Sequence, residues 1–446
     1  MVDLKQLARR IFHETLAAID IPLTMQRELL REGSLLRCGP AAIDLSHFKK
    51  VRVVAIGKAA HAMLDGLIVI LPRDFSFAGI ASAPVAPATP QPAIQYFIGG
   101  HPIPNEDSWN AAKAILEMLS ACDNQTLVFF LLSGGGSALV ELPLDPLLTL
   151  ADMQQIHRAL VGCGAPIEAI NTVRKHISAV KGGRLVTAAN GATKITLAIS
   201  DVPAGKEWAL ASGPTLPDPT TLSDMEDVLD KYLLGDKFPG ALYRWIASGA
   251  PAETPKAGDP SFKNAHFSVL LGLDNLFHPA HGAAEGAGCI TCCDNATDDW
   301  PVELAAEYLL AQLEELRSIN PSRYVAVIAD GEVSSPITGN GIGGRNAAFV
   351  LSCVEKIAKK NIAVLSAGTD GIDGNSPAAG AVADGETLTR AHAAGLDPHD
   401  AFKRSDAYTF FNRLDDAIIT GATGNNLRDF RVLIASPDAE SSSTEA

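Results

Sequence analysis

The stretch Thr126-Leu-Val-Phe-Phe-Leu-Leu-Ser-Gly-Gly-Gly-Ser-Ala-Leu139 carries the strongest fold signal in the chain. Its first half, Thr126 to Leu132, is strongly apolar, which is typical of a buried strand in an α/β sheet. Glycines flanked by serines follow directly, and such a turn lets the backbone wrap closely around an anion. A flexible turn without a ligand is the alternative. We favour an anion-binding loop made of Ser133, Gly134, Gly135, Gly136 and Ser137.

Strand and helix patterns alternate on both sides of this stretch. The run Val51-Arg-Val-Val-Ala-Ile-Gly57 predicts a second buried strand that leads into a helix, and Lys194 to Ile199 predicts a third. Helical periodicity appears at Leu4 to Ala18, Ser108 to Leu119 and Gln154 to Val161. This alternation predicts a mostly parallel sheet with both faces covered.

The length of 446 residues exceeds what one hydrophobic core usually supports, so we expect two domains. Residues 249–262 lose periodicity and concentrate Pro, Gly and Ala, and we place the boundary there. The predicted domains are residues 1–248 and 263–435, and we expect the polar tail 436–446 to be disordered. The second domain is predicted from strands at Phe267–Leu273, Tyr324–Ala329 and Ile362–Ala367 and a helix at Pro301–Ile319.

Composition limits the classes of function. The formal net charge of -15 argues against a nucleic-acid partner, which needs a clustered basic surface. The sequence shows no signal peptide and no apolar run long enough to span a membrane. Seven scattered cysteines fit a reducing compartment better than a disulfide framework. We therefore expect a cytoplasmic protein with no membrane partner.

Charged residues follow several of the predicted strands. Lys58 lies in the turn after the strand that ends at Gly57, and Arg345 ends the glycine-rich loop Gly339-Asn-Gly-Ile-Gly-Gly-Arg345. A solvated lysine is the alternative for Lys58. A cleft built from Lys58, Arg174, Lys175, Lys181, Arg184 and Arg345 would suit phosphoryl transfer, which depends on positioning and charge neutralisation.

Aspartates also follow predicted strands. Asp201, Asp370 and Asp373 are candidates for holding Mg²⁺ or for accepting a proton. An Asx-turn or a helix cap is the alternative for each of them taken singly.

A series of motifs resembles the glycerate 2-kinase family, also called the MOFRL family. The first half carries Gly57-Lys-Ala59, Gly99-Gly-His-Pro-Ile-Pro-Asn-Glu106, Leu132-Ser-Gly-Gly-Gly-Ser-Ala-Leu139, Asn171-Thr-Val-Arg-Lys-His176, Ser200-Asp-Val-Pro203 and Ala211-Ser-Gly-Pro-Thr-Leu-Pro-Asp-Pro-Thr220. The second half carries Gly339-Asn-Gly-Ile-Gly-Gly-Arg-Asn346, Gly368-Thr-Asp-Gly-Ile-Asp-Gly374, Ala378-Ala-Gly-Ala-Val382 and Thr420-Gly-Ala-Thr-Gly424.

The resemblance implies a Rossmann-like N-terminal three-layer domain with a parallel sheet, a C-terminal MOFRL-type α/β domain and an active site in the cleft between them. It also implies ATP-dependent phosphorylation of D-glycerate to 2-phosphoglycerate with Mg²⁺, and it leaves a homodimer open. By position, Lys58 and Arg345 would stabilise the transferring phosphoryl group, and Asp201 would act as base or metal-side carboxylate. The candidates for substrate or phosphate binding are Ser133 to Ser137, His101, Arg174 and Lys175.

The chain departs from the usual family pattern at several positions. It reads Ala204-Gly205-Lys206 where members usually have Gly-Asp, and Ala347-Ala348 where Gln-Glu is usual. These departures keep open a kinase fold with a changed hydroxy-acid acceptor or without turnover. A second alternative is a hydroxypyruvate reductase, a name that relatives of the family have carried. The reductase is disfavoured because Gly57-Lys-Ala-Ala60 lacks the Gly-x-Gly-x-x-Gly pattern of dinucleotide sites.

Overall fold

A computed structural model describes residues 2–72, 75–189, 191–203, 205–425 and 427–437. The chain forms two compact units. The inserted unit comprises Ile21–Gly272, and the terminal unit combines Met1–Asp20 with Leu273–Ala446. The chain therefore begins in one unit, builds the whole of the other and then returns to the first.

The inserted unit contains a six-stranded parallel sheet with the order β6-β5-β4-β7-β8-β9. The strands are β4 (Lys50–Ile56), β5 (Phe77–Ala83), β6 (Ile94–Ile98), β7 (Thr126–Leu132), β8 (Thr193–Ile199) and β9 (Ala265–Leu271). Successive strands run outward from β4 on one side and from β7 on the other. The direction in which successive strands are added to the sheet thus reverses between β4 and β7, as in a doubly wound fold. Ligands of open α/β sheets bind at such a point.

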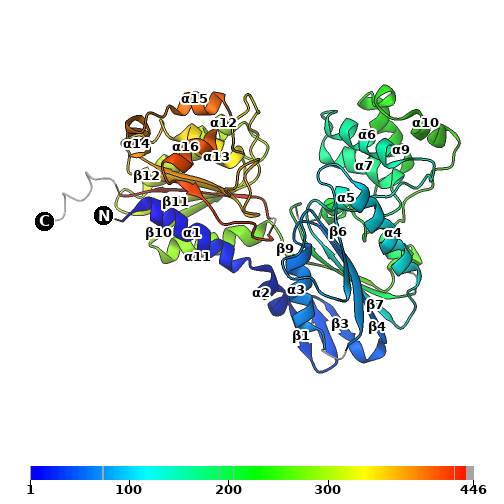
Figure 1. Ribbon diagram of the computed structural model, residues 1–446. Helices are drawn as coiled ribbons and strands as arrows, with labels where there is room; N and C mark the ends of the chain where they lie inside the picture. The colour runs from blue at the N-terminus through cyan, green and yellow to red at the C-terminus, as the bar shows by residue number, and fades with distance from the viewer. Residues whose placement is uncertain (1, 73–74, 190, 204, 426, 438–446) are drawn as a thin grey trace. The chain divides into compact units, whose positions relative to one another are not determined.

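Helices cover both faces of this sheet, which confirms the predicted Rossmann-like three-layer domain (Figure 1). The helix α3 (Ala60–Ile70) packs on β4, β5 and β7, whereas α4 (Glu106–Ser120) packs on β5, β6 and α8 (Arg184–Ala188). All seven residues of β7 are buried, as its apolar sequence predicts.

A second, helical core lies within the inserted unit and was not predicted. It is built from α6 (Leu150–Val161), α7 (Ile167–Ile177), α9 (Leu222–Lys231) and α10 (Gly240–Ala247). The remaining elements are α2 (Ile21–Glu28), α5 (Gly136–Leu139) and a small antiparallel sheet of β1 (Leu29–Glu32), β2 (Leu35–Cys38) and β3 (Ala41–Asp44).

The terminal unit contains a mixed sheet with the order β10-β11-β15-β12-β13-β14. Only β10 and β11 pair in parallel; every other neighbouring pair of described strands is antiparallel. The strands are β10 (Cys289–Asp294), β11 (Tyr324–Asp330), β12 (Ile362–Gly368), β13 (Gly380–Asp384), β14 (Ala417–Ile418) and β15 (Asp429–Ala435).

Two helical layers also cover this sheet. On one face lie α1 (Leu4–Ala18) and α11 (Asp274–Gly286), which pack on Ala326 and Ile328. On the other lie α12 (Val302–Ile319) and α13 (Arg345–Cys353), against Val325 and Val327. The short helices α14 (Thr387–Ala393), α15 (Pro398–Lys403) and α16 (Ala407–Arg413) complete the unit.

The division of the chain differs from the predicted domain limits in two places. Residues 265–271 form β9 at the edge of the first sheet, because their backbone pairs with β8 rather than starting a new sheet. The helix α1 belongs to the terminal unit, because its apolar face packs on β12 and β15. Most of the tail that we expected to be disordered, residues 438–446, lies outside the described residues.

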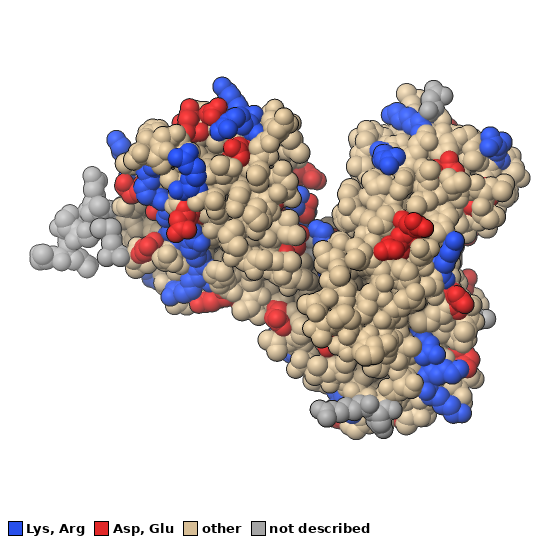
Figure 2. All heavy atoms as spheres, viewed as in Figure 1, with Lys and Arg blue, Asp and Glu red and all other residues tan. Residues whose placement is uncertain are grey.

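Among the described residues, no helix combines the length and the apolar character that a membrane span requires. On the face drawn in Figure 2, described acidic and basic side chains are interspersed and form no continuous basic patch.

Candidate active site

The loops that follow β4 and β7 are joined directly at the point where the strand order reverses. The N–H of Lys58 donates to the Gly134 carbonyl at 3.0 Å, and the N–H of Ala59 donates to Ser133 Oγ at 3.0 Å. Gly57 has a φ of 128°, and a Cβ at this position would lie 2.1 Å from Ser133 Oγ. This close approach requires glycine and holds Lys58 beside the predicted anion-binding loop.

Two side chains, those of His101 and Lys58, lie against that loop. A Cβ on Gly135, which has a φ of 83°, would lie 3.0 Å from His101 Cδ2 and 3.5 Å from Lys58 Cγ. Burial, together with the positive charges of Lys58 and Arg174, lowers the pKa of His101. The structure thus brings Lys58 and His101 to the glycine loop, and Arg174 is near enough to His101 to affect its pKa.

Arg174 is the unusual member of this group. It lies in the last turn of α7, is 7% exposed, and its Nε has no hydrogen-bond partner among the described residues. Burial lowers the pKa of Arg174, and Glu141 opposes this shift. A buried guanidinium with an unsatisfied N–H is costly unless an anion pairs with it. The site therefore contains a buried cationic donor suited to a carboxylate or a phosphate.

Two other predicted cations are already paired. Lys175 Nζ lies 3.1 Å from Asp218 Oδ1 and 4.1 Å from the centre of the Trp208 ring. Lys181 Nζ lies 2.7 Å from Glu141 Oε2. Both lysines are buried, so their charges are neutralised inside the protein. The structure supports Lys175 as a buried ion-pair residue rather than as a group available to a ligand.

Glu141 organises a buried polar network that sequence reasoning missed. It accepts hydrogen bonds from Lys181 Nζ and from Ser178 Oγ, the latter at 2.6 Å. It also pairs with His157 Nε2 at 2.8 Å. Although burial alone would raise the pKa of Glu141, Lys181 and His157 lower it to about 2. Glu141 is at least 16 residues from each of these partners in the sequence, so no local spacing could have revealed the network.

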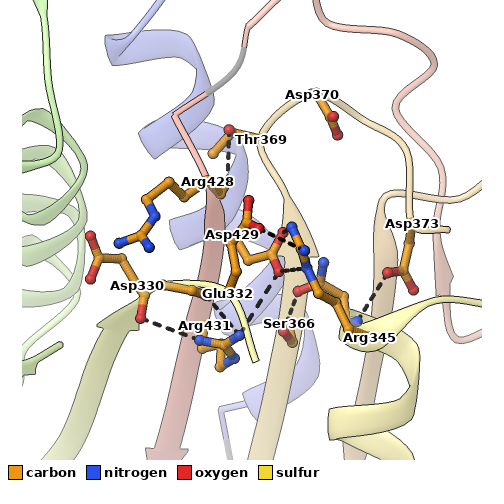
Figure 3. Close-up of polar contacts among 12 residues, drawn as sticks. Asp330, Glu332, Arg345, Ser366, Thr369, Asp370, Asp373, Arg428, Asp429 and Arg431 are labelled. Atoms are coloured by element: carbon orange, nitrogen blue, oxygen red, sulfur yellow. Dashed lines mark hydrogen bonds and ion pairs between the residues drawn. The ribbon is translucent and has the colours of Figure 1, made fainter. Parts of the chain in front are cut away.

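The terminal unit presents a second charged cluster, centred on Arg345 at the start of α13 (Figure 3). Arg345 Nε donates to Asp429 Oδ2 at 2.5 Å, and Nη1 donates to Glu332 Oε2 at 2.7 Å. Burial alone would lower the pKa of Arg345, but Asp429 and Glu332 together raise it. Their carboxylates hold the guanidinium in one orientation and occupy part of its five N–H donors.

Asp373 serves this cluster as a helix cap. Its two oxygens accept the N–H groups of Asn346 and Ala347, each at 2.9 Å. Burial raises the pKa of Asp373 to about 6, against the effect of these hydrogen bonds. Because both oxygens are used by the backbone, the helix-cap alternative describes Asp373 better than a metal ligand does.

The other two metal candidates are not gathered into a cage. Asp370 Oδ1 accepts the N–H of Ile372 at 3.0 Å, which is an Asx-turn, and Asp201 lies just beyond β8, partly buried. Within the described ranges, no three His, Cys, Asp or Glu side chains are placed to hold a metal ion.

Asp330, at the end of β11, adds a buried carboxylate beside the Arg345 cluster. Its Oδ1 has no hydrogen-bond partner among the described residues, and burial raises its pKa to about 6. Arg428 pairs with Asp298, while Arg431 donates to the backbone carbonyls of Asp330 and Gly331. We did not single out Asp298, Asp330, Arg428 or Arg431 as site residues from the sequence.

Comparison with known proteins assigns the family. Residues 7–247 match a family model described as a domain of unknown function, DUF4147, and residues 325–429 match the MOFRL family. The D-glycerate 2-kinase of Thermotoga maritima is 33% identical over 383 residues, which cover 85% of this chain and 89% of that protein. The chain belongs to the glycerate kinase family. The resemblance found in the sequence motifs is thereby confirmed.

Other members of the glycerate kinase family extend the match. The crystal structure of a glycerate kinase from Thermotoga maritima superposes with a TM-score of 0.81 at 30% identity, covering 97% of this chain and 99% of that one. A protein of Agrobacterium vitis that is 34% identical over 438 residues, 97% of this chain and 95% of its own, carries the name of a hydroxypyruvate reductase.

Proposed function

We propose that this protein is a D-glycerate 2-kinase, which transfers the γ-phosphoryl group of ATP to the C2 hydroxyl of D-glycerate. The observation that carries the proposal is the buried Arg174 guanidinium, whose Nε lacks a partner within the described residues. Burial and the positive charges of Lys58 and Arg174 lower the pKa of His101, which lies with Lys58 against the glycine loop. This arrangement at the switch point of a doubly wound sheet suits a small organic anion. The names of the family members identify glycerate as the anion to test first.

In the proposed reaction, Arg174 binds the carboxylate of D-glycerate. The C2 oxygen attacks the γ-phosphorus of ATP, the bond from that phosphorus to ADP breaks, and Asp201 accepts the hydroxyl proton. Lys58 and Arg345 neutralise charge on the transferring group. The paired carboxylates that orient Arg345 would reduce the reorganisation that this step requires.

Magnesium would arrive with the nucleotide. Mg²⁺ in kinases usually keeps several waters and takes one or two carboxylates together with substrate phosphates. The described residues fit that mode, because they offer single carboxylates such as Asp201 and Asp370 and no three-residue cage. The ion would supply charge neutralisation for the phosphates.

The test is ADP release from ATP and Mg²⁺ with each enantiomer of glycerate, followed by separation of 2- and 3-phosphoglycerate. We expect release that depends on D-glycerate, with 2-phosphoglycerate as product. Lys58→Ala should lower kcat by about 100-fold or more while the melting temperature changes little, because removing one preorganised charge costs about 3 kcal/mol in the transition state. Folded wild-type protein that releases no ADP with either enantiomer would refute the proposal.

A hydroxypyruvate reductase is the second candidate, on the name carried by the Agrobacterium vitis relative. The turn after β4 reads Gly57-Lys58-Ala59-Ala60 and lacks the glycine pattern that lets a pyrophosphate approach in dinucleotide-binding folds. NADH oxidation dependent on hydroxypyruvate would favour the reductase. If neither activity is found, a panel of hydroxy acids with ATP tests a changed acceptor.

A further inference from the structure

A chain of three polar side chains ends at the anion-binding loop. Ser137 Oγ hydrogen-bonds Ser212 Oγ, and Ser212 Oγ donates to Asn171 Oδ1 at 2.9 Å. Asn171 Nδ2 donates to the Ala209 carbonyl at 3.3 Å. Ser212 and Asn171 are buried, whereas Ser137 is partly exposed. These hydrogen bonds therefore connect the buried Asn171 of α7 to the partly exposed Ser137 of the loop.

The hydrogen bonds in this chain can run in one direction only. The amide group of Asn171 is oriented by its bond to the Ala209 carbonyl, which requires Nδ2 on that side and leaves Oδ1 facing Ser212. The single hydroxyl proton of Ser212 is therefore used on Asn171. Consequently Ser137 must donate its proton to Ser212, and the Ser137 oxygen is left as an acceptor.

The backbone that holds Ser212 is strained in a way that supports a functional role. Ala211, Ser212 and Gly213 have consecutive φ values of 51°, 61° and 60°, in the left-handed region that alanine and serine disfavour. A Cβ on Gly136 would lie 2.7 Å from the Cβ of Ala211, so this turn packs directly on the loop. Such strain is found mainly where it positions groups of a site.

We propose that Ser137 selects hydroxylated carboxylic acids by accepting a hydrogen bond from a ligand hydroxyl, and that Ser212 and Asn171 are positioning residues that keep Ser137 in this acceptor state. The inference rests on the proposed function for the choice of glycerate as ligand. In this arrangement the anion would be bound by Arg174 and backbone N–H groups rather than by the Ser137 hydroxyl. A ligand without a hydroxyl would leave the Ser137 oxygen unpaired.

The test compares the binding of D-glycerate and propionate, which lacks both hydroxyls, by isothermal titration calorimetry of the full-length protein. Ser137→Ala and Ser212→Gly should each reduce the preference for D-glycerate over propionate by roughly 3- to 10-fold, the size expected for one hydrogen bond. Glycine suits the positive φ of Ser212, so this variant should remain folded. Ser405→Gly is the matched control, since Ser405 also has a positive φ, of 54°, and lies in the terminal unit.

The outcomes separate this inference from the proposed function. A preference that stays within twofold of wild type in both folded variants would overturn the role of Ser137 and Ser212, even if ADP release depends on D-glycerate. A preference that falls in both variants without any ADP release would support the selection of hydroxylated acids and refute the kinase reaction. Wild-type protein without any preference for D-glycerate over propionate would overturn the inference directly.

Discussion

Arg174 and Lys175 are neighbours in α7 and both side chains are buried, but their surroundings differ. Lys175 forms an ion pair with Asp218, whereas Arg174 Nε has no hydrogen-bond partner in the described part of the chain. The two residues were equal candidates in the sequence, because residue type and position cannot show which charge is already neutralised. Only the fold, which brings Asp218 to Lys175, distinguishes the cation that a ligand can use.

Replacing Arg174 with Met should therefore weaken substrate binding without unfolding the protein. We expect the KM for D-glycerate to rise about 10- to 150-fold, the equivalent of a lost charge-assisted hydrogen bond of about 1.5–3 kcal/mol. The melting temperature should stay the same or rise, since an unsatisfied buried group is removed. Lys175→Met is the matched control and should show the opposite pattern, with unfolding free energy reduced by about 3–5 kcal/mol because Asp218 loses its partner. Equal effects of the two variants on KM would contradict the assignment.

Glu141 should make the stability of the protein sensitive to acid. Its pKa is lowered to about 2 in the folded state from an ordinary value of 4.5, so the folded state binds fewer protons than the unfolded state between these values. Stability is then fully present above about pH 4.5 and is lost as the pH falls toward 2. Urea denaturation should show this fall in wild type and less of it in Glu141→Gln. At pH 7, the free energy of unfolding of Glu141→Gln should be about 3–5 kcal/mol lower than that of wild type, because Lys181 keeps a buried charge without its partner.

At the scale of elements, several strands and helices could be predicted, whereas the left-handed turn at Ala211 and Ser212 could not. The apolar run Thr126–Leu132 coincides with β7, and Leu4–Ala18 coincides with α1. Both could be predicted because buried positions are occupied by apolar residues at the period of a strand or a helix. The sequence gives no sign of the left-handed turn at Ala211 and Ser212, because alanine and serine disfavour the positive φ values that they adopt there. Its geometry follows from packing on the glycine loop, which only the assembled sheet provides.

The helix α13 should also respond to pH through its cap. Burial raises the pKa of Asp373 to about 6 from 3.8, so the folded state holds this proton more tightly than the unfolded state does. Between about pH 4 and pH 6, the stability contributed by this group therefore falls as the pH rises, by up to about 3 kcal/mol. The pKa of Asp330 is also raised, so Asp330 changes the stability in the same direction. The contribution of Asp373 is therefore measured as the difference in unfolding free energy between wild type and Asp373→Asn. Identical stability profiles of the two proteins across this range would show that Asp373 does not titrate there.

At the scale of the whole molecule, the sequence predicted two α/β domains correctly and misplaced their limits. The Pro- and Gly-rich segment at residues 249–262 is a real connection, but it joins two parts of the same unit. Local composition can show where a chain turns, whereas the pairing of β9 with β8 depends on residues that are distant in sequence. The membership of α1 is likewise decided by contacts with strands near the other end of the chain.

The domain limits in the structure and those predicted from sequence lead to different expectations for isolated fragments. Residues 21–272 should fold cooperatively and bind D-glycerate, because the sheet, the helical core and Arg174 all lie within them. Residues 1–248 should be less stable and more prone to aggregate, since they lack β9 and leave the apolar face of α1 uncovered. Thermal unfolding followed by circular dichroism, with calorimetric titration of D-glycerate, compares the two. Greater stability of the fragment 1–248 would argue for the limits predicted from sequence.

The divided terminal unit also sets the order of events on the ribosome. The helix α1 is synthesised before the inserted unit, but β12 and β15, on which Phe12 and its neighbours pack, are synthesised after it. The inserted unit can complete its sheet while translation continues, whereas the terminal unit cannot close until the last strand has left the exit tunnel. We expect the nascent chain to carry an uncovered apolar helix through most of its synthesis, a segment that holdase chaperones would recognise.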